Sequence, residues 1–274
     1  MRRRAFVMGL VALVGGGCAG APRRAAPRGP AAVVAEALRL AGTREGLASL
    51  AKGMRGVVMG FAGADLFGDP DLVTRLLEEE ITGERLYVAH AAHVATRFDA
   101  QRFERLLALL REPLPRRMTA MEVAAAGVEP DTVAAWASTV EATEAGRARL
   151  ALARRIDDAI RGTEATLAVL VATGRGALRA FGAAIPPGPG DPLADFRATV
   201  AKLEPEIRAQ TVASLAFTYR DATMDEIVQY AESLESELGR WFSRLQREGA
   251  VYAAEVVTEA AIRRILEARR APRA

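Results

Sequence analysis

From Ala31 onwards, apolar residues recur every three or four positions, which is the spacing of one face of an α-helix. Ala, Leu, Arg and Glu, which favour helices, dominate this part of the chain, whereas runs of Val, Ile, Thr and aromatic residues are nearly absent. The pattern predicts an all-α fold, a multi-helix bundle of eight to ten helices with no sheet. The first apolar stripe consists of Val34, Leu38, Leu40, Leu47, Leu50 and Met54.

Two Asp-Pro pairs predict helix starts, because an acidic N-cap is followed by a proline at the first helical position. Asp69-Pro70 is expected to open a helix that continues to about Arg97, with Gly83 as a candidate pause. Asp191-Pro192 opens a second helix after the loop signal at 185–190, which reads IPPGPG.

Further helices are expected over 131–145 and over 147–181. Thr223 and Glu226 have the spacing of a capping box, which predicts a helix over 224–248. A last helix is expected to begin at Gly249 and to run to about Arg269.

An internal repeat is indicated by matching positions in the two halves of the chain. Gly42-Thr43 and Gly162-Thr163 are 120 positions apart, and a second block repeats with an offset of 124. We interpret 31–128 as a first helical module and 129–274 as a second copy with a linking helix. The second block aligns Phe103, Leu106, Leu110, Leu114, Met118 and Met121 with Ile227, Tyr230, Leu234, Leu238, Phe242 and Leu245.

Two segments carry a family resemblance. Thr223–Leu245 (TMDEIVQYAESLESELGRWFSRL) and Ala35–Leu50 resemble helices of the family called domain of unknown function 2059. Ser236 and Gly239 match a Ser-Pro-x-Gly step of that family, with Glu237 in the position of the proline. The resemblance implies a helical, mostly exported bacterial protein, and it carries no catalytic residues.

The amino terminus predicts export. Residues 1–17 contain a basic start and an apolar stretch from Ala5 to Val14, too short to span a bilayer but suited to a signal peptide. Cys18 follows three glycines, which resembles a bacterial lipoprotein signal although Gly15 replaces the usual aliphatic residue. The resemblance implies lipidation of Cys18, including palmitate. The alternative is an ordinary secretory signal with an incidental cysteine.

The same resemblance implies a location. Ala19 replaces the Asp that retains lipoproteins at the inner membrane, so the expected site is the outer membrane, on its periplasmic face. Acyl chains on Cys18 would bind the protein stably to the membrane. Residues 18–30, rich in Ala, Pro, Arg and Gly, are expected to form a flexible tether. Arg3-Arg4-Ala5-Phe6 also resembles a twin-arginine signal, so both export routes stay open.

The basic character of the chain lies mainly outside the predicted domain. The formal charge is +3, and Arg2, Arg3 and Arg4 belong to the predicted signal, which leaves a mature chain of about zero charge. Arg23, Arg24 and Arg28 lie in the tether, so the folded part is slightly acidic. Nucleic acid is therefore not expected as a partner.

The histidines are the candidate metal ligands. His90 and His93 are three residues apart on a predicted helix, so both rings could face one metal ion. A third ligand is missing, because Glu78, Glu79 and Glu80 lie nearly three turns away. The alternative is a half-buried helix face, and no metal or other cofactor is expected.

No catalytic motif stands out. The chain lacks a Gly-x-Ser-x-Gly elbow and a phosphate-binding loop, and its single cysteine is Cys18. Paired carboxylates such as Asp157-Asp158 and Asp225-Glu226 are expected on helix surfaces or at caps. We therefore predict a protein that is not an enzyme.

Aromatic residues gather in the second half, where they fill a core or line a groove for an apolar ligand. Two functions fit this sequence. The first is an envelope lipoprotein whose helical module is structural or binds another envelope protein. The alternative is a carrier of a lipid or other hydrophobic small ligand between helices. The aromatic residues are Trp136, Phe217, Tyr219, Tyr230, Trp241, Phe242 and Tyr252.

Overall fold

A computed structural model describes residues 29–67, 69–182 and 190–270. These residues form thirteen helices and no strand, so the all-α prediction is confirmed and the expected number of eight to ten helices was too low. The predicted signal peptide, Cys18 and most of the tether lie outside the described residues. No helix in the described ranges combines the length and the apolar character needed to cross a bilayer.

The first six helices occupy the predicted first module. They are α1 (Pro30–Leu40), α2 (Thr43–Phe67), α3 (Pro70–Glu80), α4 (Gly83–Ala95), α5 (Ala100–Leu110) and α6 (Pro113–Ala125). The other seven follow the boundary at 128/129. They are α7 (Pro130–Glu141), α8 (Glu144–Ile160), α9 (Gly162–Gly182), α10 (Pro192–Ala201), α11 (Glu204–Thr218), α12 (Met224–Glu235) and α13 (Glu237–Arg270).

Three predicted helix starts are confirmed with their caps. The side chains of Asp69 and Asp191 each accept hydrogen bonds from two backbone N–H groups of the first turn. Thr223 and Glu226 form both hydrogen bonds of a capping box at the start of α12. Local side-chain chemistry therefore determines these helix starts.

Several predicted helix boundaries were wrong. The segment expected to be helical from Asp69 to about Arg97 is two helices that separate at the candidate pause, because Thr82 adopts an extended backbone and caps α4 at Gly83. The helix expected over 147–181 breaks at Arg161, whose backbone is left-handed.

The expected break at Gly249 was also wrong. The chain breaks instead at Ser236, whose hydroxyl accepts a hydrogen bond from the N–H of Gly239 at 3.0 Å, and α13 continues through Gly249. Gly249 packs against the ring of His90, where an added Cβ would lie 2.8 Å from ring atoms. Its role is close packing within the helix.

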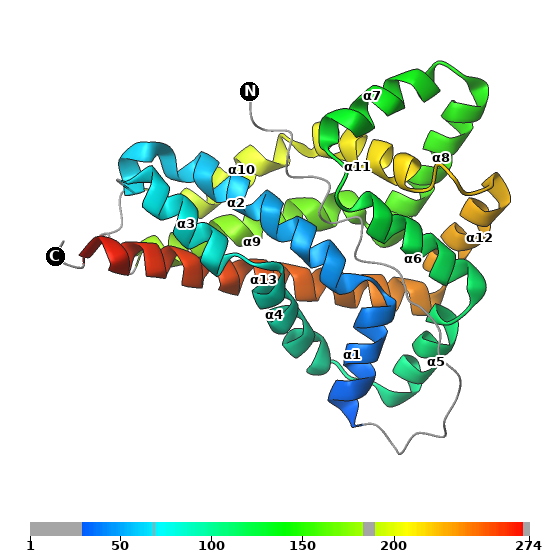
Figure 1. The fold of residues 1–274 in the computed structure, drawn as a ribbon, viewed down its shortest axis with the longest axis horizontal. Helices are drawn as coiled ribbons and strands as arrows, with labels where there is room; N and C mark the ends of the chain where they lie inside the picture. Colours follow the sequence, from blue (N-terminus) through cyan, green and yellow to red (C-terminus); the bar gives the residue numbers. More distant parts are fainter. Residues whose placement is uncertain (1–28, 68, 183–189, 271–274) are drawn as a thin grey trace.

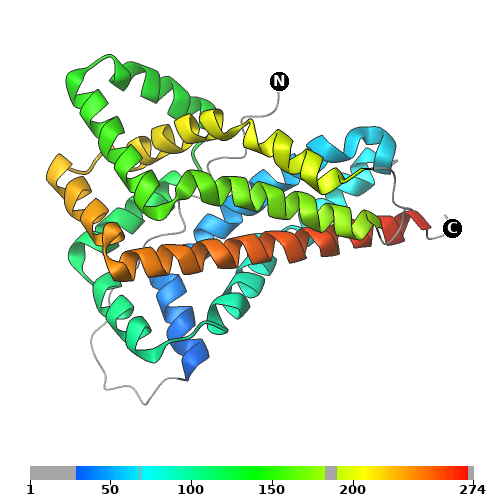
Figure 2. The same cartoon turned by 180° about the vertical axis from the view of Figure 1, so that it is seen from behind.

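The long helix α13 runs through the middle of the molecule, with α9 alongside it (Figures 1 and 2). Gly176 of α9 lets the two backbones approach closely, since an added Cβ would lie 2.3 Å from the carbonyl oxygen of Glu255. Arg175 and Arg179 of α9 both pair with the Glu255 carboxylate. The α9–α13 pair therefore forms the central contact of the fold.

Three apolar clusters surround this pair. The largest joins α2, α3 and α4 to α9 and α13. The second places Met118 of α6 among residues of α8, α11 and α12. The third places Phe242 and Leu245 of α13 among residues of α1, α4 and α5. Every cluster draws side chains from both sides of the boundary at 128/129, so the two predicted modules share their cores.

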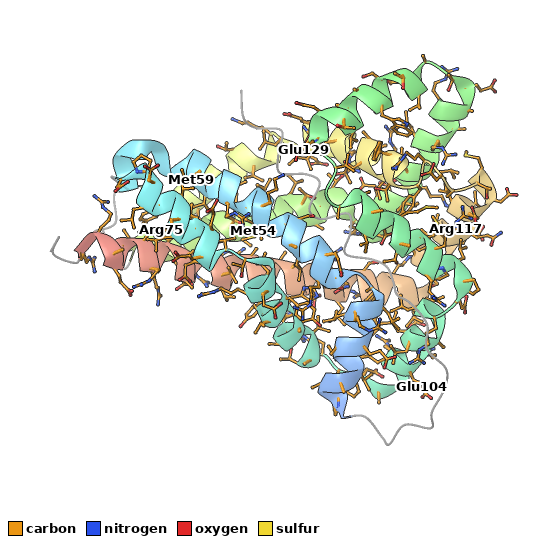
Figure 3. All side chains as sticks on the ribbon, in the orientation of Figure 1. Met54, Met59, Arg75, Glu104, Arg117 and Glu129 are labelled. Carbon is orange, nitrogen blue, oxygen red and sulfur yellow. The ribbon has the colours of Figure 1, made fainter. Side chains whose placement is uncertain are left out.

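Exposed ion pairs also connect the two sides of this boundary. Lys52 of α2 donates to Glu129, just before α7, at 2.8 Å, and Arg117 of α6 pairs with Glu226 of α12. Glu129 and Arg117 are labelled in Figure 3. Because Lys52, Glu129 and Arg117 are exposed to solvent, the pairs add little stability beyond that of the shared apolar clusters.

The order of helix breaks repeats along the chain. The N-caps Asp99 and Thr223 are 124 positions apart, and so are the extended residues Glu112 and Ser236. This spacing equals the offset of the second block of the sequence repeat. The recurrence supports the interpretation of a duplicated module, which itself stays a prediction.

Candidate functional site

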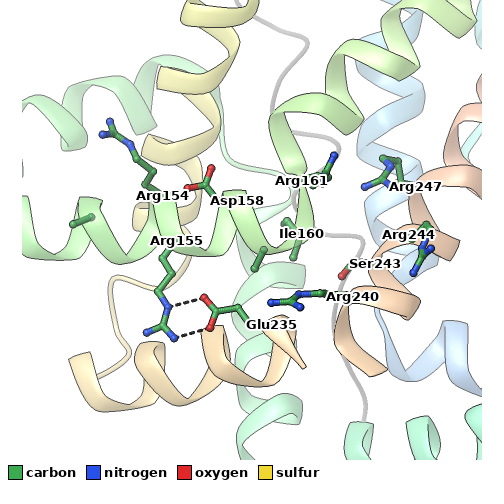
Figure 4. Close-up of a pocket in the computed structure, with 12 residues that line it drawn as sticks. Arg154, Arg155, Asp158, Ile160, Arg161, Glu235, Arg240, Ser243, Arg244 and Arg247 are labelled. Carbon is green, nitrogen blue, oxygen red and sulfur yellow. Dashed lines mark hydrogen bonds and ion pairs between the residues drawn. The ribbon is translucent and has the colours of Figure 1, made fainter. Parts of the chain in front are cut away.

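A pocket of about 830 Å³ lies between the end of α8, the end of α12 and the start of α13 (Figure 4). Six of its twelve lining residues are arginines, and two are acidic. We call it the arginine pocket. Its lining residues are Ala151, Arg154, Arg155, Asp158, Ala159, Ile160, Arg161, Glu235, Arg240, Ser243, Arg244 and Arg247.

Helical periodicity aligns the arginines of α13. Arg240, Arg244 and Arg247 are four and three positions apart, which places them along one side of the helix. The opposite side of α13 carries Phe242 and Leu245, which are buried in the third cluster. Packing of that apolar face therefore holds the arginine stripe against the end of α8.

Both acidic residues of the pocket have arginine partners. The Glu235 carboxylate accepts two hydrogen bonds from Arg155, each at 2.7 Å, and these bonds lower the pKa of Glu235 (Figure 4). Asp158 lies 3.4 Å from the guanidinium of Arg208, outside the pocket. The lining residues nevertheless carry a formal charge of +4, from six arginines and two carboxylates.

The remaining five arginines make no ion pair with any carboxylate in the described part of the chain. They are Arg154, Arg161, Arg240, Arg244 and Arg247. Arg161 lies near Arg247, and Arg240 extends toward Glu235 (Figure 4). Burial, followed by the charge of Arg161, lowers the pKa of Arg247. The pocket is therefore a local concentration of positive charge.

Arg161 has a costly backbone conformation. Its φ angle is 54°, and it is the only non-glycine residue with positive φ among the described residues. This left-handed conformation costs roughly 1–2 kcal/mol for a residue with a Cβ. At the α1–α2 junction of the first predicted module, Gly42 has a φ of 55°. In the predicted repeat, however, Gly42 aligns with Gly162, and Arg161 aligns with Ala41, whose φ angle is −88°.

Asp157 stabilises the turn at Arg161. Its carboxylate accepts hydrogen bonds from the backbone N–H of Thr163 at 2.8 Å and from the Thr163 hydroxyl at 2.6 Å. Asp157 is completely buried, so the expectation of a solvated surface was wrong, whereas its hydrogen bond to the first turn of α9 agrees with the expected role as a cap. Its second partner is Arg208, 3.3 Å away. This network fixes the backbone from which Arg161 extends.

Ser243 adds an uncharged hydrogen-bonding group to the pocket. The residue is 5% exposed, and its hydroxyl oxygen is buried without a hydrogen-bond partner. A hydroxyl can donate one hydrogen bond and accept others. Burying it without a partner is unfavourable, so the group has unused capacity to bind a ligand in the pocket.

The two histidines lie between α4 and α13. His90 Nε2 donates to Oε1 of Gln246 at 2.6 Å, and burial lowers the pKa of His90 from 6.5 to about 4. His93 stacks on Tyr252 with ring centroids 5.1 Å apart. The described residues contain no group of three or more His, Cys, Asp or Glu that could hold a metal ion. Both rings contribute to helix packing.

A buried carboxyl group lies elsewhere, at the contact of α6 with α11 and α12. Glu122 is 1% exposed, and its Oε1 accepts hydrogen bonds from the hydroxyls of Tyr219 and of Tyr230, the latter at 2.9 Å. Its Oε2 is buried without a partner. Burial raises the pKa of Glu122 from 4.5 to about 7, against the opposing effect of the two tyrosines. Glu122 has no local sequence signal, because its two tyrosine partners are 97 and 108 positions further along the chain.

Most aromatic residues of the second half fill the core. Phe217, Tyr219, Tyr230 and Phe242 are buried, and Trp136 packs edge-on against Phe217. Tyr252 is 44% exposed. The core interpretation is therefore confirmed for the four buried rings.

The chemistry of the arginine pocket favours binding. Arginine guanidinium groups stay charged and bind oxyanions with paired N–H donors. None of the twelve lining residues is a histidine or a cysteine. The lining thus consists of six arginines, two carboxylates with arginine partners, one free hydroxyl and three apolar side chains, and its excess of cations suits an anionic ligand.

No family model, curated protein or solved structure shows significant similarity to the chain.

Proposed function

We propose that this protein is an exported, lipid-anchored helical module that binds an anionic ligand in the arginine pocket and does not catalyse a reaction. The observation that carries the proposal is the group of five arginines without ion-pair partners around one pocket. Like charges held together repel one another, and an anion between them relieves that repulsion.

The lipoprotein signal supports the anchored part of the proposal. Acylation of Cys18 would attach the mature chain to the outer membrane, facing the periplasm. The eleven residues between Cys18 and Pro30, where α1 begins, would span up to about 40 Å if fully extended. The tether would therefore let the pocket reach ligands at or near the membrane surface, or on an envelope partner protein.

The alternative of a carrier for apolar ligands gains less support. Its strongest candidates were the aromatic residues of the second half, and four of them belong to the packed core. The arginine pocket would expose an apolar ligand to charged groups that need solvation or a counter-ion. An anionic ligand fits these lining residues better.

Isothermal titration calorimetry with pyrophosphate tests the binding function. The purified protein should bind pyrophosphate, and Arg244→Ala combined with Arg247→Ala should weaken binding by about tenfold or more. Arg264→Ala is the matched control, because Arg264 is exposed on the same helix but outside the pocket. Equal losses in the control and in the double variant would contradict a specific site.

Palmitate labelling tests the anchor separately. Cells that express the wild type should incorporate labelled palmitate into this chain, and Cys18→Ser should abolish the label. Labelling that survives the substitution would reject lipidation at Cys18.

A further inference from the structure

The arginines of the pocket form an elongated set. Arg240 and Arg247 are seven residues apart on α13, which corresponds to about 10 Å along the helix. Arg161 faces the Arg247 end of this stripe, and Arg240 lies at the end near Glu235 (Figure 4). The positive charge is therefore spread along the pocket.

A small anion of one charge cannot satisfy this arrangement. It would lie at one end of a stripe whose backbone positions span about 10 Å along the helix. A ligand with several negative charges balances the formal charge of +4 better. A phosphate group carries nearly two charges near neutral pH, and its oxygens can accept from guanidinium and hydroxyl donors together.

We infer that the ligand of the arginine pocket carries at least two phosphate groups, held by Arg161 and Arg247 at one end and by Arg240 at the other, with Ser243 as a hydroxyl donor between them. This inference rests on the proposed anion-binding function. The phosphates could belong to a free oligophosphate or to a lipid headgroup with two phosphates, since both present the same chemistry.

The backbone of Arg161 is an independent observation in favour of this assignment. Glycine adopts a left-handed conformation without the steric cost that arginine has, so glycine would be the less strained residue at this position. The Asp157–Thr163 hydrogen bonds hold the turn without using the Arg161 side chain. The side chain of Arg161 thus makes no described ion pair that would account for an arginine at this position.

Calorimetry at constant ionic strength tests the class of ligand. We compare orthophosphate, pyrophosphate, tripolyphosphate and citrate, the last as a multivalent anion without phosphorus. Tripolyphosphate should bind at least about tenfold more tightly than orthophosphate and than citrate. Equal affinities for citrate and tripolyphosphate would overturn the phosphate assignment but leave an anion-binding function intact. If the protein binds none of these anions and neither of the vesicles described below, both the phosphate assignment and the anion-binding function are rejected.

Variants of Arg161 separate a role in binding from a role in folding. Arg161→Gly should keep or raise the unfolding temperature, because the left-handed strain is relieved, and should weaken tripolyphosphate binding about tenfold or more. Arg161→Lys keeps the charge and should retain part of the affinity. Unchanged tripolyphosphate affinity in Arg161→Gly would overturn the role of Arg161.

Vesicle sedimentation distinguishes the two sources of phosphate. The Cys18→Ser protein, which lacks the anchor, is mixed with vesicles that contain cardiolipin, with two phosphates, or phosphatidylglycerol, with one, at matched lipid charge. Preference for cardiolipin that is lost in Arg161→Gly assigns the site to a lipid headgroup. Equal binding to both vesicles together with tight tripolyphosphate binding assigns it to a free oligophosphate. Equal binding to both vesicles and equal affinity for all four free anions would overturn the inference.

Discussion

Met118 of α6 and Phe242 of α13, which are 124 positions apart, each lie in the core of the other half of the molecule. Met118 is fully buried among residues of α8, α11 and α12, and Phe242 is buried among residues of α1, α4 and α5. Leu114 and Leu238 repeat this relationship at the same spacing, again on α6 and α13. The last helix of each predicted module therefore completes the core of the other module.

This exchange predicts that the chain unfolds as one unit. Trp136 packs on the second cluster and Trp241 on the third, so each tryptophan reports on a different core. The single-tryptophan variants Trp136→Phe and Trp241→Phe should have coincident denaturation midpoints by fluorescence. Two separate transitions would show that the two halves fold independently.

A cavity at Phe242 should destabilise both halves of the molecule. Phe242→Ala removes a buried ring from the third cluster, and we expect a loss of about 3–5 kcal/mol in the free energy of unfolding. Both tryptophan probes should report the same loss in urea titrations. A loss seen by Trp241 alone would contradict the shared core.

Glu122 should make stability depend on pH. Its pKa is about 7 in the folded protein and 4.5 as its ordinary value, so the folded state holds the proton more tightly. The stabilising contribution of Glu122 protonation is therefore greatest below about pH 4.5, declines as pH rises, and is lost above pH 7. The total change in the free energy of unfolding is about 3 kcal/mol. Glu122→Gln keeps an acceptor for Tyr219 and Tyr230, so it should remove this decline.

The measurement is the stability difference between Glu122→Gln and wild type at several pH values. Between pH 5 and pH 8, the free energy of unfolding of the variant should rise relative to that of the wild type. The comparison is needed because the lowered pKa of His90 acts in the opposite direction, destabilising the fold as pH falls from about 6.5 to 4. A difference that stays constant over this range would mean that Glu122 titrates normally.

Substitution of alanine for glycine should have opposite effects on stability at two positions on different helices. Gly176→Ala would force a Cβ against the backbone of α13, and we expect a loss of about 1–3 kcal/mol in the free energy of unfolding. Gly56→Ala on α2 meets no atom within 4 Å and should stabilise the helix by up to about 1 kcal/mol. Thermal unfolding of both variants checks this pair, and equal effects would contradict the close α9–α13 contact.

Helix starts were predictable from the sequence because their signals are local. Asp69, Asp191 and Thr223 cap the helices that their sequence patterns indicate. The break at Arg161 was missed because a left-handed arginine has no local sequence signal. Gly249 was misread as a helix boundary, since the ring of His90 that requires it comes from a distant part of the chain.

The arginine pocket was not predicted, for a similar reason. Its arginines come from α8 and α13, about eighty positions apart, and only the packing of these helices brings them together. The net charge of the mature chain, which is near zero, also gave no indication of a basic pocket, because acidic residues lie on other surfaces. The spacing of Arg240, Arg244 and Arg247 was the one signal available, and a stripe of this kind is usually a solvated helix face.

Side-chain NMR of the arginines tests the location of the binding site most directly. Arginine Nε–Hε signals of the ¹⁵N-labelled protein are followed during titration with tripolyphosphate. We expect saturable shifts at Arg161, Arg240 and Arg247, while the signal of Arg264 stays in place. Shifts of similar size at exposed arginines on all faces, or none at the three pocket arginines, would contradict a binding site in the arginine pocket.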